Sequence, residues 1–209
     1  MEMDTKKRDL LLRAGTFFMR NGLKGPNMGD VARELRISKK TLYKYVSDKR
    51  DLVRQAIEVL LEEDRKEIHE IISKDINAID KVYLINMKVG MKLRTLQPSV
   101  MYDLKHFFPE ADCAINQQHE NFTYDIIRQI HRQGIKEGLF RADIDVEILA
   151  KINVLLIRAM FDEQRFPQEQ YSFAEVHREI SNYHLRGIVS PAGEDYINTL
   201  RKKIKDKEF

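Results

Sequence analysis

A dense run of cationic, hydroxyl and phenolic side chains occupies residues 39–49 of the sequence. Its order is KKTLYKYVSDK, and the groups that can contact a polyanion are Lys39, Lys40, Thr41, Tyr43, Lys44, Tyr45 and Lys49. Lysine ammonium groups neutralise phosphates, and hydroxyl groups hydrogen-bond to phosphate oxygens or to base edges. The chemistry that this segment predicts is therefore nucleic-acid binding.

Two short helices are predicted to position these groups. Apolar residues recur at helical spacing over residues 28–35, and after a turn at 36–38 a second segment covers residues 39–46. Asn27 and Ser38 are good N-caps, because their side-chain oxygens can accept hydrogen bonds from backbone N–H groups at a helix start. Two helices joined by a turn of about three residues form a helix-turn-helix, whose second helix enters a DNA groove.

The sequence before this pair predicts a further helix over Thr5–Asn21. Its apolar residues follow the helical period, and Gly22 can end it because glycine adopts the left-handed conformation at little cost. The core of this three-helix unit is expected to contain Phe17, Phe18, Val31, Ala32, Leu35, Ile37, Leu42 and Val46.

The basic charge of the chain is concentrated at this end. The 209 residues carry a formal net charge of +3. Residues 1–50 contain 13 Lys and Arg against 6 Asp and Glu, a balance of +7, whereas the rest of the chain contains 23 against 27, a balance of −4. Because cation–phosphate contacts supply most non-specific DNA affinity, this asymmetry favours a polyanionic partner. A basic surface without a partner is the alternative.

Side chains that could catalyse a reaction or bind a metal are scattered. No carboxylate or cysteine completes a metal-ligand set at a recognisable spacing around the six histidines, His69, His106, His119, His131, His177 and His184. The single cysteine, Cys113, has no evident base in its local sequence and excludes an internal disulfide framework. No glycine-rich phosphate loop is present. We therefore expect no enzyme activity, no metal and no cofactor.

Helical patterns continue to the end of the chain, with a turn-rich break at Gly134–Asp145. The further predicted helices cover residues 49–73, a segment ending at Leu96 before Pro98, Ser99–Phe107, Ala111–Gln133, Val146–Phe161, 173–188 and 194–206. No strand pattern is present, and no apolar run approaches the ~18 residues that cross a bilayer. The charged start, MEMDTKKRD, is not typical of a secretory signal. These patterns predict an all-α, cytoplasmic protein without membrane association.

The stretch Phe17–Leu52 resembles the DNA-binding domain of the TetR family of bacterial transcriptional regulators. The elements that carry the resemblance are Phe17-Phe18…Gly22, Asn27…Val31-Ala32, Ile37-Ser38, Thr41-Leu42-Tyr43-Lys44-Tyr45-Val46 and Lys49…Leu52. Three positions depart from the family pattern, which usually has glycine at Arg36, a small residue at Lys40 and an aromatic residue at Val46. Arg36 must adopt the turn conformation of a glycine at some cost or close the turn differently.

The resemblance implies roles for individual residues in DNA binding. Lys39, Lys40, Thr41 and Lys44 would lie within reach of base edges or nearby phosphates. Tyr43 and Tyr45 are expected to contact phosphate or thymine methyl groups. Lys49 would bind a phosphate, helped by the N-terminus of its helix, and Asn27 would cap its helix and contact phosphate through its backbone.

The resemblance also implies a division into a DNA-binding domain, 1–50, and a helical effector-binding and dimerisation domain, 51–209. The apolar helices 146–161 and 173–188 would pair with their copies in a four-helix bundle, through Ile152, Leu156, Met160, Ile180, Tyr183 and His184. A homodimer places two recognition helices about one DNA turn apart, which predicts a palindromic double-stranded operator. Repression is the usual activity in this family.

A small-molecule effector is a further expectation from the family. Met, aromatic and isolated polar residues on the middle helices suit adaptable apolar binding; the candidates are Asn86, Met87, Met91, Tyr102, His106, Phe107, Phe122 and Asn153. Core packing is the alternative for each of them. The expected ligand is hydrophobic or amphipathic, and a C-terminal domain that binds a protein partner instead remains open; an exposed apolar patch without an enclosed cavity would favour it.

Overall fold

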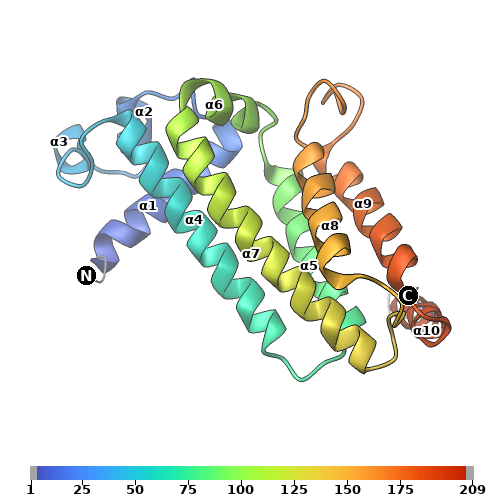
Figure 1. Ribbon diagram of the computed structural model, residues 1–209. Coiled ribbons are helices and arrows are strands. Elements are labelled where there is room, and N and C mark those ends of the chain that lie inside the picture. Colours follow the sequence, from blue (N-terminus) through green and yellow to red (C-terminus); the bar gives the residue numbers. More distant parts are fainter. Residues whose placement is uncertain (1–3, 206–209) are drawn as a thin grey trace. The chain divides into compact units, whose positions relative to one another are not determined.

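A computed structural model describes residues 4–205 of the chain, without the side chains of residues 110, 111, 113–118 and 201–205 (Figure 1). In this part of the chain ten helices are present: α1 (Thr5–Asn21), α2 (Met28–Glu34), α3 (Lys39–Leu42), α4 (Lys49–Ile72), α5 (Ala78–Thr95), α6 (Ser99–Phe107), α7 (Pro109–Lys136), α8 (Val146–Ala159), α9 (Phe173–Ile188) and α10 (Pro191–Lys205). The described residues contain one isolated β-bridge, between Phe140 and Val189, and no sheet. The prediction of an all-α fold is confirmed.

The contacts between residues divide the chain into two compact units. Unit 1 comprises the described residues up to Ile68 together with Thr95–His119. Unit 2 comprises His69–Arg94 together with the described residues from Glu120 onward. The predicted boundary between residues 50 and 51 falls near the start of α4 and stays a prediction.

The core of unit 1 contains the residues that the apolar periodicity selects. Leu11, Ala14, Phe18, Val31 and Leu42 are completely buried, and α6 adds Val100 and Leu104 to the same cluster. Phe17 and Ile37, predicted as core residues, are only partly buried and pack against its edge. Burial of this apolar surface is the main force that holds α1 to α4 and α6 together.

Several helix ends differ from their predicted positions. Helix α7 begins at Pro109 and continues to Lys136, so the predicted break at Gly134 starts later than expected. Gly134 lies inside the helix, and the ring of Phe140 packs directly on it: a β-carbon there would lie 2.1 Å from that ring, so a larger residue does not fit at this position. Helix α8 ends at Ala159 rather than Phe161. The side chain of Cys113, singled out from the sequence, lies outside the described residues.

Within residues 4–205, no helix combines the length and the apolar character that crossing a bilayer requires.

Two histidines pair inside unit 2. The Nε2 atoms of His131 on α7 and His184 on α9 lie 2.8 Å apart, and their rings stack with centroids 5.0 Å apart. One ring donates its N–H and the other accepts it, which two neutral rings can do. The other ring nitrogen of His131, Nδ1, is buried without a hydrogen-bond partner among the described residues. Burial lowers the pKa of His131 to about 4, and burial together with the neighbouring His131 lowers the pKa of His184 to about 4.

We predict that the free energy of unfolding decreases as the pH falls from about 6.5 towards about 4. In this range the unfolded chain binds protons at both histidines, whose ordinary pKa is 6.5, whereas the folded chain does not. Above about 6.5 the contribution is fully present. Urea unfolding at a series of pH values measures the effect.

The double variant His131→Gln, His184→Gln should have a flatter dependence of stability on pH, since amides do not titrate. His106→Gln, which replaces an exposed histidine on α6, is the matched control and should leave the slope unchanged. An unchanged slope in the double variant would contradict the assignment.

Candidate functional site

Helix α2 is fixed at its start by the side chain of Asn27. Its Oδ1 accepts hydrogen bonds from the N–H groups of Gly29 (2.7 Å) and Asp30 (3.2 Å). The carboxylate of Asp30 in turn accepts the N–H of Asn27 at 2.9 Å, which completes a capping box. The predicted cap is therefore present, and the Asn27 N–H predicted to contact phosphate is already donated within the protein.

The turn between α2 and α3 is closed by Arg36 in a left-handed conformation, with φ of 57°. The chain thus takes the first of the two possibilities predicted for a residue that replaces glycine. The N–H of Ile37 then donates to the carbonyl of Ala32 at 3.0 Å, and the guanidinium of Arg13 donates to the carbonyl of Leu35 at 3.1 Å. These bonds set the direction in which α3 leaves the turn.

Helix α3 is shorter than the predicted segment 39–46. Ser38 caps it as expected, accepting the N–H of Thr41 at 3.0 Å, but the α-helix ends at Leu42. The next N–H groups, of Lys44 and Tyr45, donate to carbonyls only three residues back, at 3.2 and 3.0 Å. This tighter turn, typical of helix ends, replaces the last predicted helical turn.

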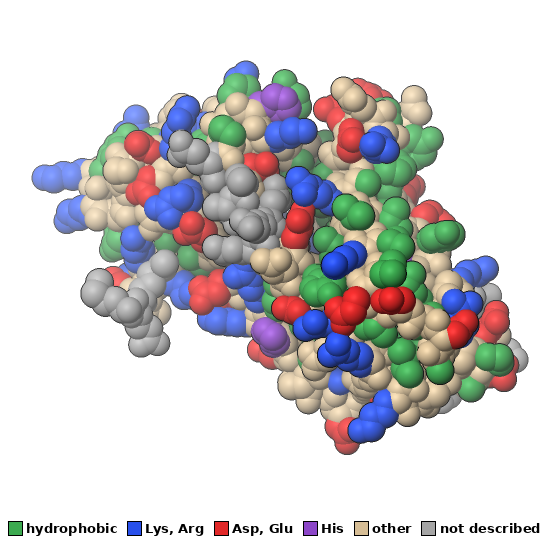
Figure 2. All heavy atoms as spheres, in the orientation of Figure 1, with side chains coloured by type: hydrophobic (Ala, Val, Ile, Leu, Met, Phe, Trp, Pro, Cys, Tyr) green, Lys and Arg blue, Asp and Glu red, His purple; other side chains and the backbone are tan. Residues whose placement is uncertain are grey.

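Four of the predicted DNA-contacting side chains are exposed around α3: Lys39, Lys40, Tyr43 and Lys44. Figure 2 shows Lys and Arg side chains on the surface of the region where α2 and α3 lie in Figure 1. Thr41 is half-buried with its hydroxyl 2.8 Å from that of Ser38, and Tyr45 is half-buried against the core. The surface that can meet a polyanion is therefore mainly lysine with one exposed phenol.

Lys49 begins α4 as predicted, but its ammonium group is engaged within unit 1. Its Nζ donates to the carbonyl of Lys24 at 2.7 Å. Partial burial lowers the pKa of Lys49, against the opposite effect of the carboxylates of Asp103 and Asp30. To bind a phosphate as predicted, this side chain would have to share or leave that carbonyl.

Asp103 on α6 binds the loop that carries this carbonyl. One carboxylate oxygen of Asp103 accepts the N–H groups of Leu23 and Lys24, both at 2.9 Å, and the residue is 6% exposed. The ammonium of Lys24 lies 4.4 Å from the ring centroid of Phe107, also on α6. Sequence reasoning missed Asp103, because no local pattern relates it to a loop about eighty residues earlier.

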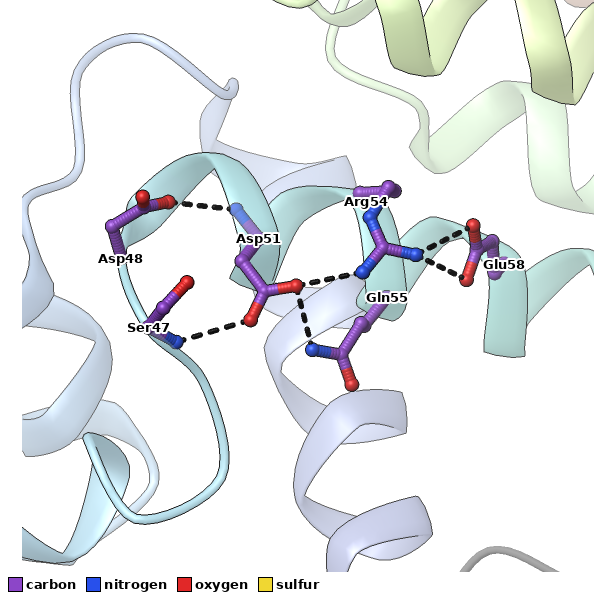
Figure 3. A network of polar contacts seen from close by, with 6 residues as sticks. All are labelled: Ser47, Asp48, Asp51, Arg54, Gln55 and Glu58. Carbon is purple, nitrogen blue, oxygen red and sulfur yellow. Dashed lines mark hydrogen bonds and ion pairs between the residues drawn. The ribbon is translucent and has the colours of Figure 1, made fainter. Parts of the chain in front are cut away.

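A network of polar contacts secures the turn before α4 (Figure 3). The carboxylate of Asp51 accepts the N–H of Ser47 (3.0 Å) and bonds from Arg54 (2.7 Å) and Gln55 (2.8 Å). Asp48 accepts the N–H of Asp51 at 2.9 Å. Burial alone would raise the pKa of Asp51, but the three hydrogen bonds outweigh it and the pKa is lowered. A charged Asp51 thus fixes the start of α4 next to α3.

The candidate dimerisation residues are divided between surface and interior of unit 2. Tyr183 and Ile152 are 76% and 42% exposed, whereas Met160 is 2% exposed and belongs to the interior. Two residues that were not predicted, Ile148 and Leu155, are 56% and 64% exposed on the same side of α8 as Ile152. Figure 2 shows hydrophobic side chains gathered over α8 and α9. The predicted apolar surface is thus present, but on α8 it is formed by Ile148, Ile152 and Leu155, and Met160 is not part of it.

Three of the eight candidate ligand residues lie together. Asn86, Met87 and Met91 line a pocket of about 640 Å³ in unit 2, bordered by α5, α9 and α10. Tyr83, Arg94 and Arg178 line it too, and were not predicted.

The other five candidates line no part of this pocket. Tyr102 stacks on His106 with ring centroids 4.0 Å apart, beside Phe107 on α6 in unit 1. Phe122 makes an edge contact with His69, and Asn153 is buried in α8.

Comparison with known proteins identifies the fold. No family model matches the sequence, and no curated protein matches it either. Among solved structures, a TetR transcription regulator from Haloarcula marismortui is similar over 90% of this chain and 100% of its own, with 17% identity and a TM-score of 0.70. A transcriptional regulator from Cytophaga hutchinsonii (90% and 100%, 18% identity, 0.69) and a TetR-family regulator from Agrobacterium tumefaciens (88% and 98%, 18% identity, 0.68) are similar as well. The chain has a TetR-like fold, as the resemblance of Phe17–Leu52 predicted.

The conformation of Arg36 yields a test of this site. We predict that Arg36→Gly raises the free energy of unfolding by up to about 1 kcal/mol, because glycine adopts positive φ without the steric penalty of a β-carbon. Chemical denaturation measures the change. Arg33→Gly, inside α2, is the matched control and should lower stability by about 1 kcal/mol; destabilisation by both would show that the Arg36 side chain contributes more than its backbone costs.

Proposed function

We propose that this protein is a homodimeric transcriptional regulator that binds a palindromic DNA operator through α2, the Arg36 turn and α3. Repression is the proposed activity, and a small molecule bound in unit 2 is proposed to modulate it. The neighbours named above, which share its fold at 17–18% identity, are described as transcriptional regulators.

The arrangement of α3 is the observation that carries this proposal. A short helix, capped by Ser38 and anchored inward by buried Leu42, presents Lys39 and Lys40 to solvent, and the turn that follows it presents Lys44. Such a helix fits the major groove, where lysines contact phosphates and base edges. The capping box of α2 and the Asp51 network hold its two flanks, so little order has to be gained on binding.

The apolar face of α8 and α9 supports a dimer. Ile148, Ile152, Leu155 and Tyr183 would each remain more than 40% exposed in a monomer. Gly187 of α9 has nothing within 4 Å of the position a β-carbon would take, and it lies one turn after Tyr183. A partner helix could therefore approach closely there, and pairing α8 and α9 with their copies would bury this face in a four-helix bundle.

The alternative of a protein partner for unit 2 is favoured by one observation. Tyr83, Met87 and Met91 of α5 are 42%, 46% and 51% exposed, and the pocket beside them opens to solvent at these residues. An apolar segment of another protein could lie there. The effect of Gly90→Phe on oligomeric mass and on ligand binding distinguishes a protein partner from a small molecule.

Lys40 offers a test of DNA binding. We predict that Lys40→Ala reduces the slope of log K against log salt concentration by about 0.9, because one phosphate contact releases about that number of counterions. Fluorescence anisotropy with a duplex selected from a random pool by the full-length protein measures the slope. Lys136→Ala, which removes an exposed lysine at the end of α7, should leave it unchanged, and equal slopes for all three proteins would overturn the assignment of α3.

Leu155 offers a test of the dimer. We predict that Leu155→Glu raises the dimer dissociation constant about tenfold or more, since burying a carboxylate in an apolar interface is costly. Because Leu155 is 64% exposed in the single chain, the variant should still fold. Sedimentation velocity measures the association state. Tyr43→Glu, an equally drastic change at another exposed apolar residue, should weaken DNA binding and leave the dimer intact; dimers of unchanged affinity in the Leu155 variant would contradict the α8 interface.

A further inference from the structure

The pocket of unit 2 is a groove with different chemistry at its two ends. The hydroxyl of Ser181 on α9 donates to Asn86 Oδ1 on α5 at 3.2 Å, which sets the register of the two helices. Figure 1 shows that α5 and α9 run in opposite directions. Arg94, in the last turn of α5, therefore lies at the same end of the groove as Arg178, in the first half of α9. The opposite end is apolar and is lined by Ile79, Val82, Leu185, Ile197 and Leu200.

Among the residues that line the charged end, two guanidinium groups, Arg94 and Arg178, stand against one carboxylate, that of Glu175. This carboxylate accepts the hydroxyl (2.7 Å) and the N–H (3.1 Å) of Ser172 in the cap of α9, and these bonds, together with the charge of Arg178, lower the pKa of Glu175. Arg94 makes no ion pair with any described residue, and the pair between Arg178 and Glu179 (3.2 Å) is exposed to solvent and hence weak. Arg94 is thus available to an anion, and Arg178 is held only by a weak exposed pair and by its attraction to Glu175. A guanidinium group binds a carboxylate through two parallel hydrogen bonds.

Gly90 keeps the middle of the groove open. It lies inside α5, where glycine is less favourable than alanine, and a β-carbon there would meet nothing within 4 Å. Packing within the chain therefore gives no reason for a glycine at this position. Met87 and Met91 flank it and are about half exposed, and methionine side chains adapt to the shape of an apolar ligand. Gly90, Met87 and Met91 thus form an apolar floor of the groove that no other part of the described chain fills.

We propose that this groove binds an elongated apolar molecule with a single anionic head group, of which a medium- or long-chain monocarboxylate is the simplest example. The head would lie between Arg94 and Arg178, and the apolar body would pass over Gly90 towards α10. The volume of about 640 Å³ is in the range of small-molecule sites. As the effector of the regulator, this ligand rests on the proposed function, but its binding can be measured without DNA.

The first experiment compares three probes of equal chain length, below their micelle concentrations, on the full-length protein. Calorimetry and thermal unfolding should show that decanoate binds and stabilises the protein. Decan-1-ol should bind about tenfold more weakly or worse, and decyltrimethylammonium should not bind. Equal binding of the cation and the carboxylate, or no binding of decanoate, would overturn the proposal.

The second experiment uses substitutions that locate the site. Gly90→Phe fills the groove and should weaken decanoate binding tenfold or more, while Gly90→Ala, the matched control, should bind it within about threefold of the original protein. The double variant Arg94→Gln, Arg178→Gln should lose the preference for decanoate over decan-1-ol. Since the space beside Gly90 is open, the unliganded Gly90 variants should fold normally by circular dichroism. Unaltered decanoate affinity in Gly90→Phe would overturn the assignment.

Two further outcomes separate this proposal from others. If Gly90→Phe changes the oligomeric mass and the original protein does not bind decanoate, the groove binds a protein chain, and the proposal of a carboxylate ligand is overturned. Decanoate binding that Gly90→Phe abolishes, together with an absence of DNA binding, would support the groove and contradict the proposed function.

Discussion

The buried carboxylate of Asp103 determines the geometry of the region before α2. It accepts two backbone N–H groups of the loop after α1, and a carboxylate at 6% exposure is stable only when such partners are present. The same loop supplies the carbonyl that binds Lys49, so α6, the loop and the start of α4 are linked through consecutive bonds. If this carboxylate lost its bonds, the loop N–H groups and the charge would all be left unsatisfied. Asp103 therefore fixes the loop before α2 on α6, in addition to the apolar core that the two share.

Local signals were sufficient to predict most of the fold. The bounds of α1 and α6 coincide with the predicted segments, and the caps at Asn27 and Ser38 have the predicted hydrogen bonds. Gly22 ends α1 with φ of 82°, as glycine was expected to do. These features depend on residues only a few positions apart, and periodicity and capping chemistry describe such interactions well. The left-handed Arg36 is one of the two possibilities that the sequence left open, because this residue replaces a glycine within a short motif.

Interactions between segments that lie far apart in the chain could not be predicted from the sequence. The sequence identified Val146–Phe161 as the most apolar helix of the chain, but only the packing of its neighbours decided that Met160 is interior and that Leu155 faces solvent. The ligand candidates were chosen by residue type, so the three that lie on one face of α5 were predicted together with five that satisfy their contacts elsewhere. The pairing of His131 with His184 joins segments about fifty residues apart, and no local sequence pattern around either histidine predicts it.

Helix α9 borders both the groove and the apolar face assigned to the dimer. Ser181 and Tyr183 are two residues apart, which places them on opposite sides of the helix at about 100° per residue. If ligand binding displaces α9 and thereby changes its fit to the second copy, the two association equilibria are coupled, and the coupling free energy is the same in both directions. The apparent affinity for the ligand would then vary with protein concentration near the dimer dissociation constant, so titrations at a single concentration would describe a mixture of two species.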